Sequence, residues 1–220
     1  VCGSAFDLPA GQVISLWGSV HPQLVKRSDV GFMLTFPFVR EGLKVSLAGT
    51  LWAADTGCFT QPEAFDTDKY IEWLVKRKQF ASKCLFATAP DVVGDAVLTL
   101  ERSLPVLPMI RDAGFKSALV AQDGLEELDI PWGDFDCLFV GGTTEWKLSE
   151  TAYALVGEAK KRDKWAHQGR ANSFRRLKAA FLSGYDSADG TFLKFAPDTN
   201  IVRMERWLER LRVQPVMRYG

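Results

Sequence analysis

Polar residues follow most of the short apolar runs in this sequence, at the points where the runs end. The groups are Asp55-Thr56-Gly57, Pro90-Asp91, Gln122-Asp123-Gly124, Gly141-Gly142-Thr143-Thr144, His167-Gln168-Gly169-Arg170 with Asn172, and Asp186 with Asp189-Gly190-Thr191. Taken singly, an aspartate before glycine or threonine is most often a turn or cap residue. Their recurrence indicates a functional site, because a rim built for stability alone would not gather carboxylates that repel one another.

Several carboxylates around one pocket suit the cleavage of a glycosidic bond. Breaking a C–N or C–O bond at an anomeric carbon develops positive charge, which one carboxylate stabilises or traps while another transfers a proton. Gln122 and the backbone of Gly141-Gly142 are suited to hydrogen-bond the Watson–Crick edge of an unstacked nucleobase. The residue types therefore favour a nucleobase or a similar glycosidic substrate, with Asp55 as the leading candidate for catalysis.

The elements that must position these residues are short strands. We expect strands at 1–6, 30–36, 51–54, 84–89, 117–121, 137–140, 165–167 and 185–187. A closed parallel barrel requires about eight such strands, and its chemistry lies on the loops after their carboxyl ends. The sequence thus predicts an α/β fold, a TIM-type (β/α)8 barrel in which residues 1–220 form a single domain.

Amphipathic stretches between the strands predict the helices of this barrel. Residues 68–80 place apolar side chains on one face, and further helices are expected at 95–113, 149–162, 173–183 and 199–212. Pro105 and Pro108 should divide the second of these into shorter pieces. Ser149 is a suitable N-cap for the third.

Bulk composition is that of an ordinary globular chain. The 220 residues are 47% hydrophobic and carry 27 basic and 27 acidic side chains, which argues against coating nucleic acid through overall positive charge. The four cysteines lack CxxC spacing, so we expect reduced buried thiols, no metal site and no cofactor. Neither a signal peptide nor a membrane-spanning apolar run is visible, so a cytoplasmic protein is expected.

At its polar groups the chain resembles the tRNA-guanine transglycosylase family (queuine tRNA-ribosyltransferases). It is more similar still to the compact deazapurine DNA-modification transglycosylases of phages and mobile elements, which implies the cytoplasm of a bacterium or a phage-infected host cell. The family's Asp-Ser-Gly-Gly-Phe, Val-Gln-Gly, Gly-Gly and Gly-x-Asp-x-x-Asp motifs resemble Asp55-Thr56-Gly57-Cys58-Phe59, Val120-Ala121-Gln122-Asp123-Gly124, Val140-Gly141-Gly142 and Gly184-Tyr185-Asp186-Ser187-Ala188-Asp189. The similarity spans roughly residues 50–200.

The resemblance implies catalytic roles for three aspartates. Asp189 would attack the anomeric carbon to give a covalent nucleoside–enzyme intermediate, with Asp186 as the alternative nucleophile. Asp55 would be the general acid and base for the outgoing and incoming bases. The implied reaction replaces guanine in nucleic acid by a free 7-deazaguanine base, such as 7-cyano-7-deazaguanine.

The resemblance also implies contacts with the substrate. Asp91 and Gln122 would bind the purine edge beside the backbone groups of Gly141 and Gly142. From the seventh strand, Arg170 would contact a phosphate and Asn172 the sugar or base, with His167 next to them. Asn172 or Ser173 could instead cap the following helix.

Two further features bear on the polynucleotide. The tRNA enzymes carry a cysteine-rich zinc subdomain near the C-terminus, whereas no cysteine follows Cys137 here, which favours DNA over tRNA. Basic residues cluster at 160–164 and at 170–178, where they would contact phosphates or form a solvated helix face.

Other functions fit the same residues. An N-glycosylase would let water complete the reaction and leave an abasic site. A non-catalytic barrel would bind nucleic acid or a partner protein, although a binder of polyanions gains nothing from buried carboxylates. A glycoside hydrolase or a phosphate-binding metabolic barrel shares the fold but lacks support from the order of the motifs.

Overall fold

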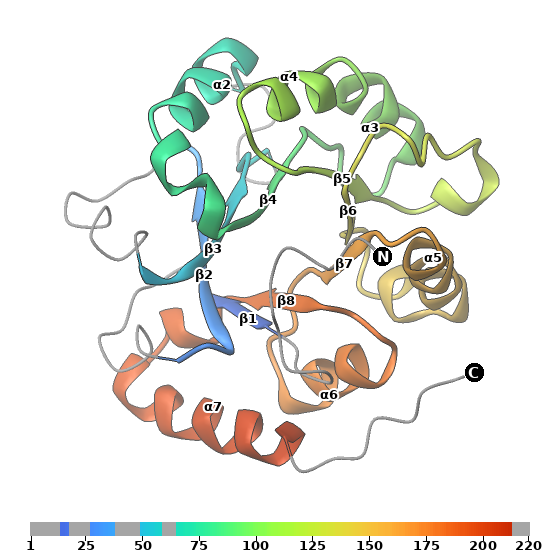
Figure 1. The fold of residues 1–220 in the computed structure, drawn as a ribbon. Coiled ribbons are helices and arrows are strands. Elements are labelled where there is room, and N and C mark those ends of the chain that lie inside the picture. Colours follow the sequence, from blue (N-terminus) through green and yellow to red (C-terminus); the bar gives the residue numbers. More distant parts are fainter. Residues whose placement is uncertain (1–13, 18–26, 38–48, 59–64, 213–220) are drawn as a thin grey trace.

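Eight strands pair in parallel and in chain order, and β8 closes the ring on β1 (Figure 1). The strands are β1 Ile14–Trp17, β2 Val30–Thr35, β3 Leu51–Asp55, β4 Cys84–Thr88, β5 Ser117–Ala121, β6 Cys137–Val140, β7 Trp165–Gln168 and β8 Ser187–Gly190. The computed structural model describes residues 14–17, 27–37, 49–58 and 65–212. The predicted single-domain (β/α)8 barrel is therefore confirmed.

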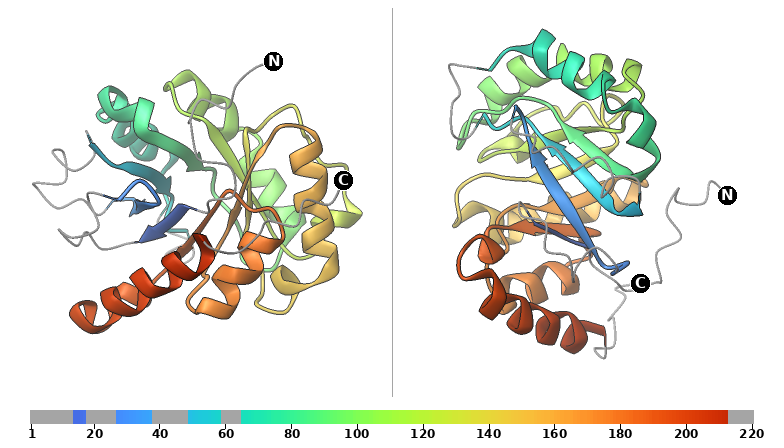
Figure 2. Two further views of the ribbon diagram at one scale, coloured as in Figure 1. Left: turned by 60° about the horizontal axis from the view of Figure 1, so that its bottom comes forward. Right: turned by 90° about the vertical axis from the view of Figure 1, so that its left-hand side faces the viewer.

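Helices surround the barrel and cover the outer face of the strands (Figure 2). The α-helices are α2 Thr67–Val75, α3 Ala96–Ser103, α4 Val106–Asp112, α5 Glu150–Lys161, α6 Phe174–Leu182 and α7 Pro197–Arg212. Short 3-10 helices are η2 Lys78–Lys83, η3 Leu125–Glu127, η4 Trp146–Leu148 and η5 Phe192–Lys194. Among the described residues, no helix is long and apolar enough to cross a membrane.

Six predicted strands, β2 to β7, are confirmed to within one residue at either end. The first prediction, residues 1–6, lies outside the described residues, and the structure has β1 at Ile14–Trp17, which the sequence reading missed. The eighth was predicted at 185–187 and forms at Ser187–Gly190. This shift matters for the site, because it puts Asp186 before the strand and Asp189 inside it.

Alternation along the strands divides the barrel interior from the layer under the helices. In β3, Trp52 and Ala54 pack in the large cluster beneath the helices, whereas Leu51 and Ala53 belong to the smaller cluster that includes inward residues of β1. Successive strand residues face opposite sides, so Asp55 follows Ala53 onto the inner face. The same period carries β8 from Ser187 to Asp189.

The helix boundaries follow the expected signals. Ser149 and Ser173 are N-caps whose side chains accept hydrogen bonds from Ala152 N and Arg176 N. The predicted helix at 95–113 divides into α3 and α4 at Pro105, as the missing backbone N–H of proline requires. The predicted helix at 68–80 ends earlier and continues as the 3-10 helix η2.

Candidate active site

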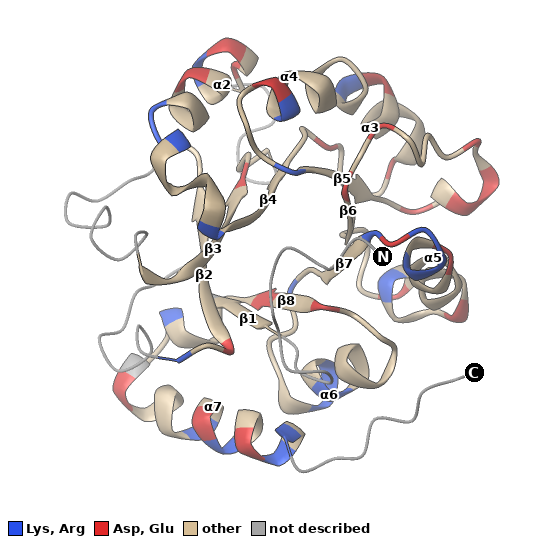
Figure 3. Cartoon of the chain, viewed as in Figure 1, with Lys and Arg blue, Asp and Glu red and all other residues tan. Residues whose placement is uncertain are grey.

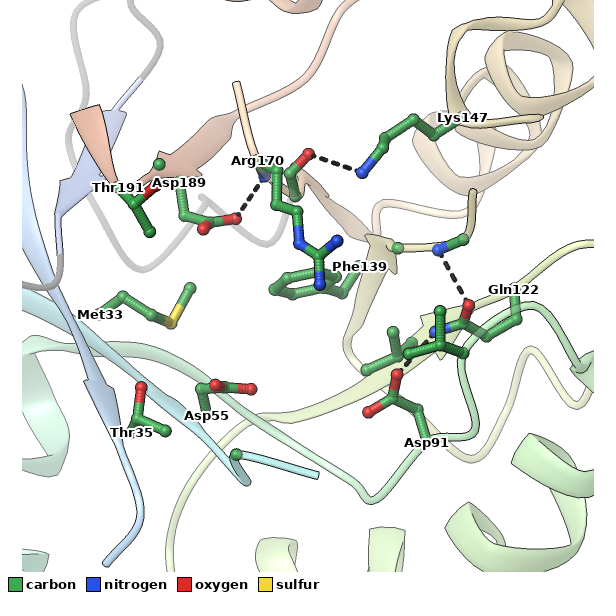
Figure 4. A pocket seen from close by; sticks show the side chains of 17 residues that line it. Met33, Thr35, Asp55, Asp91, Gln122, Phe139, Lys147, Arg170, Asp189 and Thr191 are labelled. Carbon is green, nitrogen blue, oxygen red and sulfur yellow. Dashed lines mark hydrogen bonds between the residues drawn. The ribbon is translucent and has the colours of Figure 1, made fainter. Parts of the chain in front are cut away.

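A cavity of about 230 Å³ opens at the carboxyl ends of the strands (Figure 4). It is smaller than typical drug-sized sites of about 300–1,000 Å³, which suits a compact ligand such as one heterocycle. Most of the predicted site residues line it, namely Asp55, Asp91, Gln122, Gly141, Gly142, Arg170 and Asp189. They come from six different strand ends, so the fold gathers what the sequence separates.

Asp55 is the most perturbed acid of the cavity. Burial, followed by repulsion from Asp91 and Asp189, raises its pKa to about 7. Hydrogen bonds with the Gly57 backbone and the Thr35 side chain only partly offset this effect. Asp55 is therefore suited to take up and release a proton near neutral pH.

Asp91 and Gln122 form a hydrogen-bonded wall. Gln122 Nε2 donates to Asp91 Oδ2 at 2.6 Å, and Gln122 Oε1 accepts from Gly142 N and from Gly94 N, each at 2.9 Å. Burial raises the pKa of Asp91 to about 6. Carboxylate, amide and backbone N–H thus lie in a row, which is the set of groups that can recognise a base edge.

The two glycines after β6 are required by close approach. A Cβ on Gly141 would lie 2.8 Å from Val120 Cγ1 and 2.9 Å from Gln122 Nε2. Gly142 has a φ of +66°, and its Cβ would lie 2.6 Å from the Trp146 ring. A side chain at either position would displace the Gln122 wall or the loop that supports it.

Hydrogen bonds hold the Asp189 side chain through one of its two carboxylate oxygens. Its Oδ1 accepts from Arg170 N at 3.0 Å and lies 3.2 Å from His167 Nε2. Arg170 adopts a φ of 60°, a left-handed conformation rare outside glycine, and this turn aims its N–H at the carboxylate. The side chain of Asp189 is 18% exposed, so it stays open to the cavity.

Three predicted site residues do not line the cavity. His167 is fully buried behind Asp189, and Asn172 Oδ1 accepts from Thr191 N at 2.6 Å, which fixes the loop after β8. Asp186 lies at the opposite, amino end of β8, where it accepts from Lys160 Nζ at 2.7 Å and from Ala166 N. The location of Asp186 argues against its role as the alternative nucleophile, because it lies outside the cavity that holds the other carboxylates.

The two predicted groups of basic residues lie at opposite ends of the barrel. Residues 160–164 end α5 and precede β7 at the amino end, and Lys160, Lys161 and Arg162 are paired with Asp186 or Glu158. Arg170 and the first turn of α6 lie at the cavity end. Both basic and acidic residues lie on helices such as α2, α5 and α7, whereas α6 carries only basic ones (Figure 3).

The sequence reading missed Lys147 on η4. This residue lines the cavity while only 3% exposed, and its Nζ donates to Gly169 O at 3.4 Å. Burial and the nearby charge of Arg170 lower its pKa to about 8. No periodicity marks a residue in a 3-10 turn, so only its position four residues after Thr143 in the Gly-Gly loop could have drawn attention to it.

The inner wall also has an apolar part that the sequence reading missed. Met33, Val93, Val120 and Phe139 line the cavity beside the polar groups. Such a slot suits the face of a planar ring, while its edge meets the Asp91 and Gln122 wall. Within the described residues, no group of three or more His, Cys, Asp or Glu is arranged to hold a metal ion.

No protein-family model matches the sequence, and comparison with curated proteins finds no match. Solved structures do match in fold. A mutant tryptophan synthase alpha-subunit from Pyrococcus furiosus is similar at 14% identity with a TM-score of 0.57, covering 92% of this chain and 98% of that one. A 4-hydroxy-2-oxoglutarate/2-dehydro-3-deoxyphosphogluconate aldolase from TTHB1 is similar at 14% identity with a TM-score of 0.56, covering 91% and 94%.

These similarities show that the chain has the barrel fold, and they do not identify its reaction. At such low identity a shared fold hosts many reactions. The neighbours named here are an enzyme and an enzyme subunit, and at this identity they show the fold alone.

Proposed function

We propose that this chain is a guanine transglycosylase that exchanges guanine in nucleic acid for a 7-deazaguanine base, with DNA favoured over tRNA as the substrate. The observation that carries the proposal is the difference among the three carboxylates of one cavity. Asp55 titrates near neutrality, Asp91 is bonded to an amide, and Asp189 is held at one oxygen by Arg170 N. Base exchange needs these three roles of proton transfer, base recognition and nucleophilic attack.

The reaction then runs in two balanced halves. Oδ2 of Asp189 attacks C1′ of the nucleoside, the bond from C1′ to N9 of guanine breaks, and the base leaves with the proton of Asp55. The incoming base gives its N9 proton to the Asp55 carboxylate, and its N9 attacks C1′ to release Asp189. Because Asp55 returns to its starting state, no external acid or base is consumed.

The cavity wall supports a guanine-like base. A guanine edge offers N–H donors at N1 and N2 beside an acceptor at O6. Asp91 would accept hydrogen bonds from N1 and N2 of guanine. The amide of Gln122 or the N–H of Gly142 would donate to O6, after the hydrogen bonds from Gln122 to Asp91 and from Gly142 to Gln122 have opened. Adenine presents the opposite arrangement at N1 and the 6-position, so this wall favours guanine.

Cations that line the cavity support a substrate that carries phosphate. Arg170 and Lys147 line the cavity, and Arg176 Nη1 donates to Arg170 O from the first turn of α6 at 3.5 Å. Arg170 directly follows β7, and its N–H donates to Asp189, so it lies close to where the sugar of a bound nucleotide would have to be. Phosphate contacts of this kind make affinity strongly dependent on salt.

The test is incorporation of labelled 7-cyano-7-deazaguanine into duplex DNA, single-stranded DNA and tRNA. We expect label in DNA, a covalent protein–DNA adduct on denaturing gels, and loss of both in Asp189→Asn. Asp186→Asn is the matched control, three residues away at the other end of the barrel, and it should retain activity. Absence of incorporation into every acceptor with every deazaguanine would refute the proposal.

The same assay separates the alternatives. Release of free guanine in the absence of an acceptor base would identify an N-glycosylase that leaves abasic sites. Tight DNA binding that survives Asp55→Ala and Asp189→Ala, without turnover, would identify a non-catalytic binder.

One observation favours a second candidate function. Lys147 presents an amine with a pKa of about 8 to the cavity, and such an amine can form a Schiff base with a carbonyl substrate. A carbon–carbon lyase of the same general kind as the aldolase neighbour would use Lys147 in this way. Borohydride reduction in the presence of pyruvate should then add the mass of the reduced adduct to the wild-type chain and nothing to Lys147→Met.

A further inference from the structure

A chain of hydrogen bonds runs behind the cavity and ends on Asp189. Trp165 Nε1 donates to Ser187 Oγ at 2.8 Å, and Ser187 Oγ lies 2.7 Å from His167 Nδ1. His167 Nε2 lies 3.2 Å from Asp189 Oδ1. Strands β7 and β8 alternately supply its four members, all from inward positions.

The direction of the protons in this chain follows from its last member. A carboxylate only accepts hydrogen bonds, so His167 Nε2 must carry the proton that points at Asp189 Oδ1. In a neutral ring Nδ1 then has no proton, and it accepts from the hydroxyl of Ser187. The indole N–H of Trp165 is only a donor, so it points at the oxygen of the same hydroxyl.

The surroundings of His167 keep this ring neutral and still. The side chain is fully buried, with the Phe139 ring centroid at 4.5 Å and the Phe86 centroid at 4.9 Å. Burial lowers the pKa of His167 below its ordinary value, despite the opposing effect of Asp189. A protonated ring would present a second N–H to Ser187 and break the order of donors.

We propose that His167 is a positioning residue that fixes Asp189 as the attacking group. His167 Nε2–H and Arg170 N–H both occupy Oδ1, and no described residue donates to Oδ2, which faces the cavity. The inference rests on the proposed function, since it assigns Oδ2 as the oxygen that forms the bond to C1′. His167 itself does not line the cavity and touches no reacting atom.

Ser187, His167 and Asp189 are the residue types of a serine-hydrolase triad, but the serine and the aspartate have exchanged roles. In a serine hydrolase the carboxylate orients the histidine, and the histidine takes the proton of an exposed serine. Here Ser187 is fully buried and gives its hydrogen bond inward, so it orients the histidine. The carboxylate is the open end of the chain and the group placed for attack.

The proposal is tested first by the tautomer. Nitrogen-15 NMR of the protein labelled at histidine, with His21→Gln leaving His167 as the single imidazole, should show the neutral form protonated at Nε2 near pH 7. A signal for the Nδ1–H form, or for the imidazolium, would overturn the hydrogen-bond assignment. This measurement needs no substrate.

Kinetics of base exchange test the positioning. His167→Leu should lower kcat about 100-fold with the KM for the incoming base unchanged, because the base-binding wall is on the other side of the cavity. His167→Gln keeps an amide N–H near the Nε2 position and should recover activity to within about tenfold of wild type. Equal losses in both variants, or a rise in KM that accounts for the loss, would contradict a positioning role.

Milder variants keep the test valid if His167→Leu folds poorly. Ser187→Ala removes the donor to Nδ1 and should lower kcat by about fivefold, whereas Trp165→Phe leaves that donor in place and should have little effect. The reverse order would overturn the inference. If the wild-type chain exchanges no base at all, the proposed function and the catalytic part of this inference fall together, while the tautomer still decides the hydrogen-bond chain.

Discussion

The two sides of the cavity hold the same functional group in opposite surroundings. On the first side, desolvation raises the pKa of Asp55 to about 7 and that of Asp91 to about 6. On the second side, Oδ1 of Asp189 meets two N–H donors, and Lys147 and Arg170 lie nearby. The first side is suited to hold protons and the second side is suited to present a carboxylate for attack, so one residue type serves two roles through its environment.

The largest expected effect on the rate of base exchange comes from replacing Asp55, on the first side. Asp55→Asn keeps the shape but cannot exchange a proton, so base exchange should slow by about 100- to 10,000-fold. The wild-type profile of kcat/KM against pH should have a limb near pH 7 that reports Asp55, and this limb should be absent in Asp55→Asn. A limb near pH 7 that survives the substitution would assign the titration to another group.

Substitution of Asp by Asn should change the free energy of unfolding in opposite directions on the two sides. The pKa of Asp55 is raised from 3.8 to about 7, so its burial stabilises the fold at low pH and loses that contribution as pH rises towards 7. Asp55→Asn should therefore gain about 2 kcal/mol on wild type between about pH 5 and about pH 8. Asp189→Asn weakens two hydrogen bonds to a charged acceptor and should destabilise by about 1 kcal/mol.

Urea unfolding of the three proteins at both pH values measures this difference. The variants share a substitution of Asp by Asn at an inward strand position, so each is the control for the other. If both substitutions stabilised the fold equally, the two carboxylates would have equivalent surroundings and the comparison would fail.

The sequence alone predicted the first side better than the second. Asp55 ends one apolar strand and Gln122 follows another, so the strand ends were enough to place both. Asp189 was chosen over Asp186 by resemblance, and its inward position depends on where β8 begins. The role of His167 was not predictable, because the direction of its ring depends on Phe86 and Phe139 from other strands.

The elements missed by the sequence reading share one physical cause. β1 has four residues, Ile-Ser-Leu-Trp, which is too short for alternation to distinguish a strand from a turn. Lys147 lies in a three-residue 3-10 helix whose direction is set by the loop that anchors it, through its N–H to Thr143 O at 3.1 Å. Both are decided by tertiary contacts, and neither leaves a periodic signal in the sequence.

Removing the charge of Lys147, on the second side, should have the smallest effect of these substitutions. It tests whether this side contacts the phosphates of the substrate. Lys147→Met keeps the apolar stem but loses the charge, so DNA binding should weaken by about tenfold and the slope of log Kd against log salt should fall by about one. Lys161→Met is the matched control, because Lys161 pairs with Glu158 at the far end of the barrel. A fluorescence titration over a range of salt concentrations measures both slopes. If Lys147→Met and Lys161→Met weaken binding equally, the phosphates do not lie at the cavity, and the charge of Lys147 serves the carboxylate of Asp189 alone.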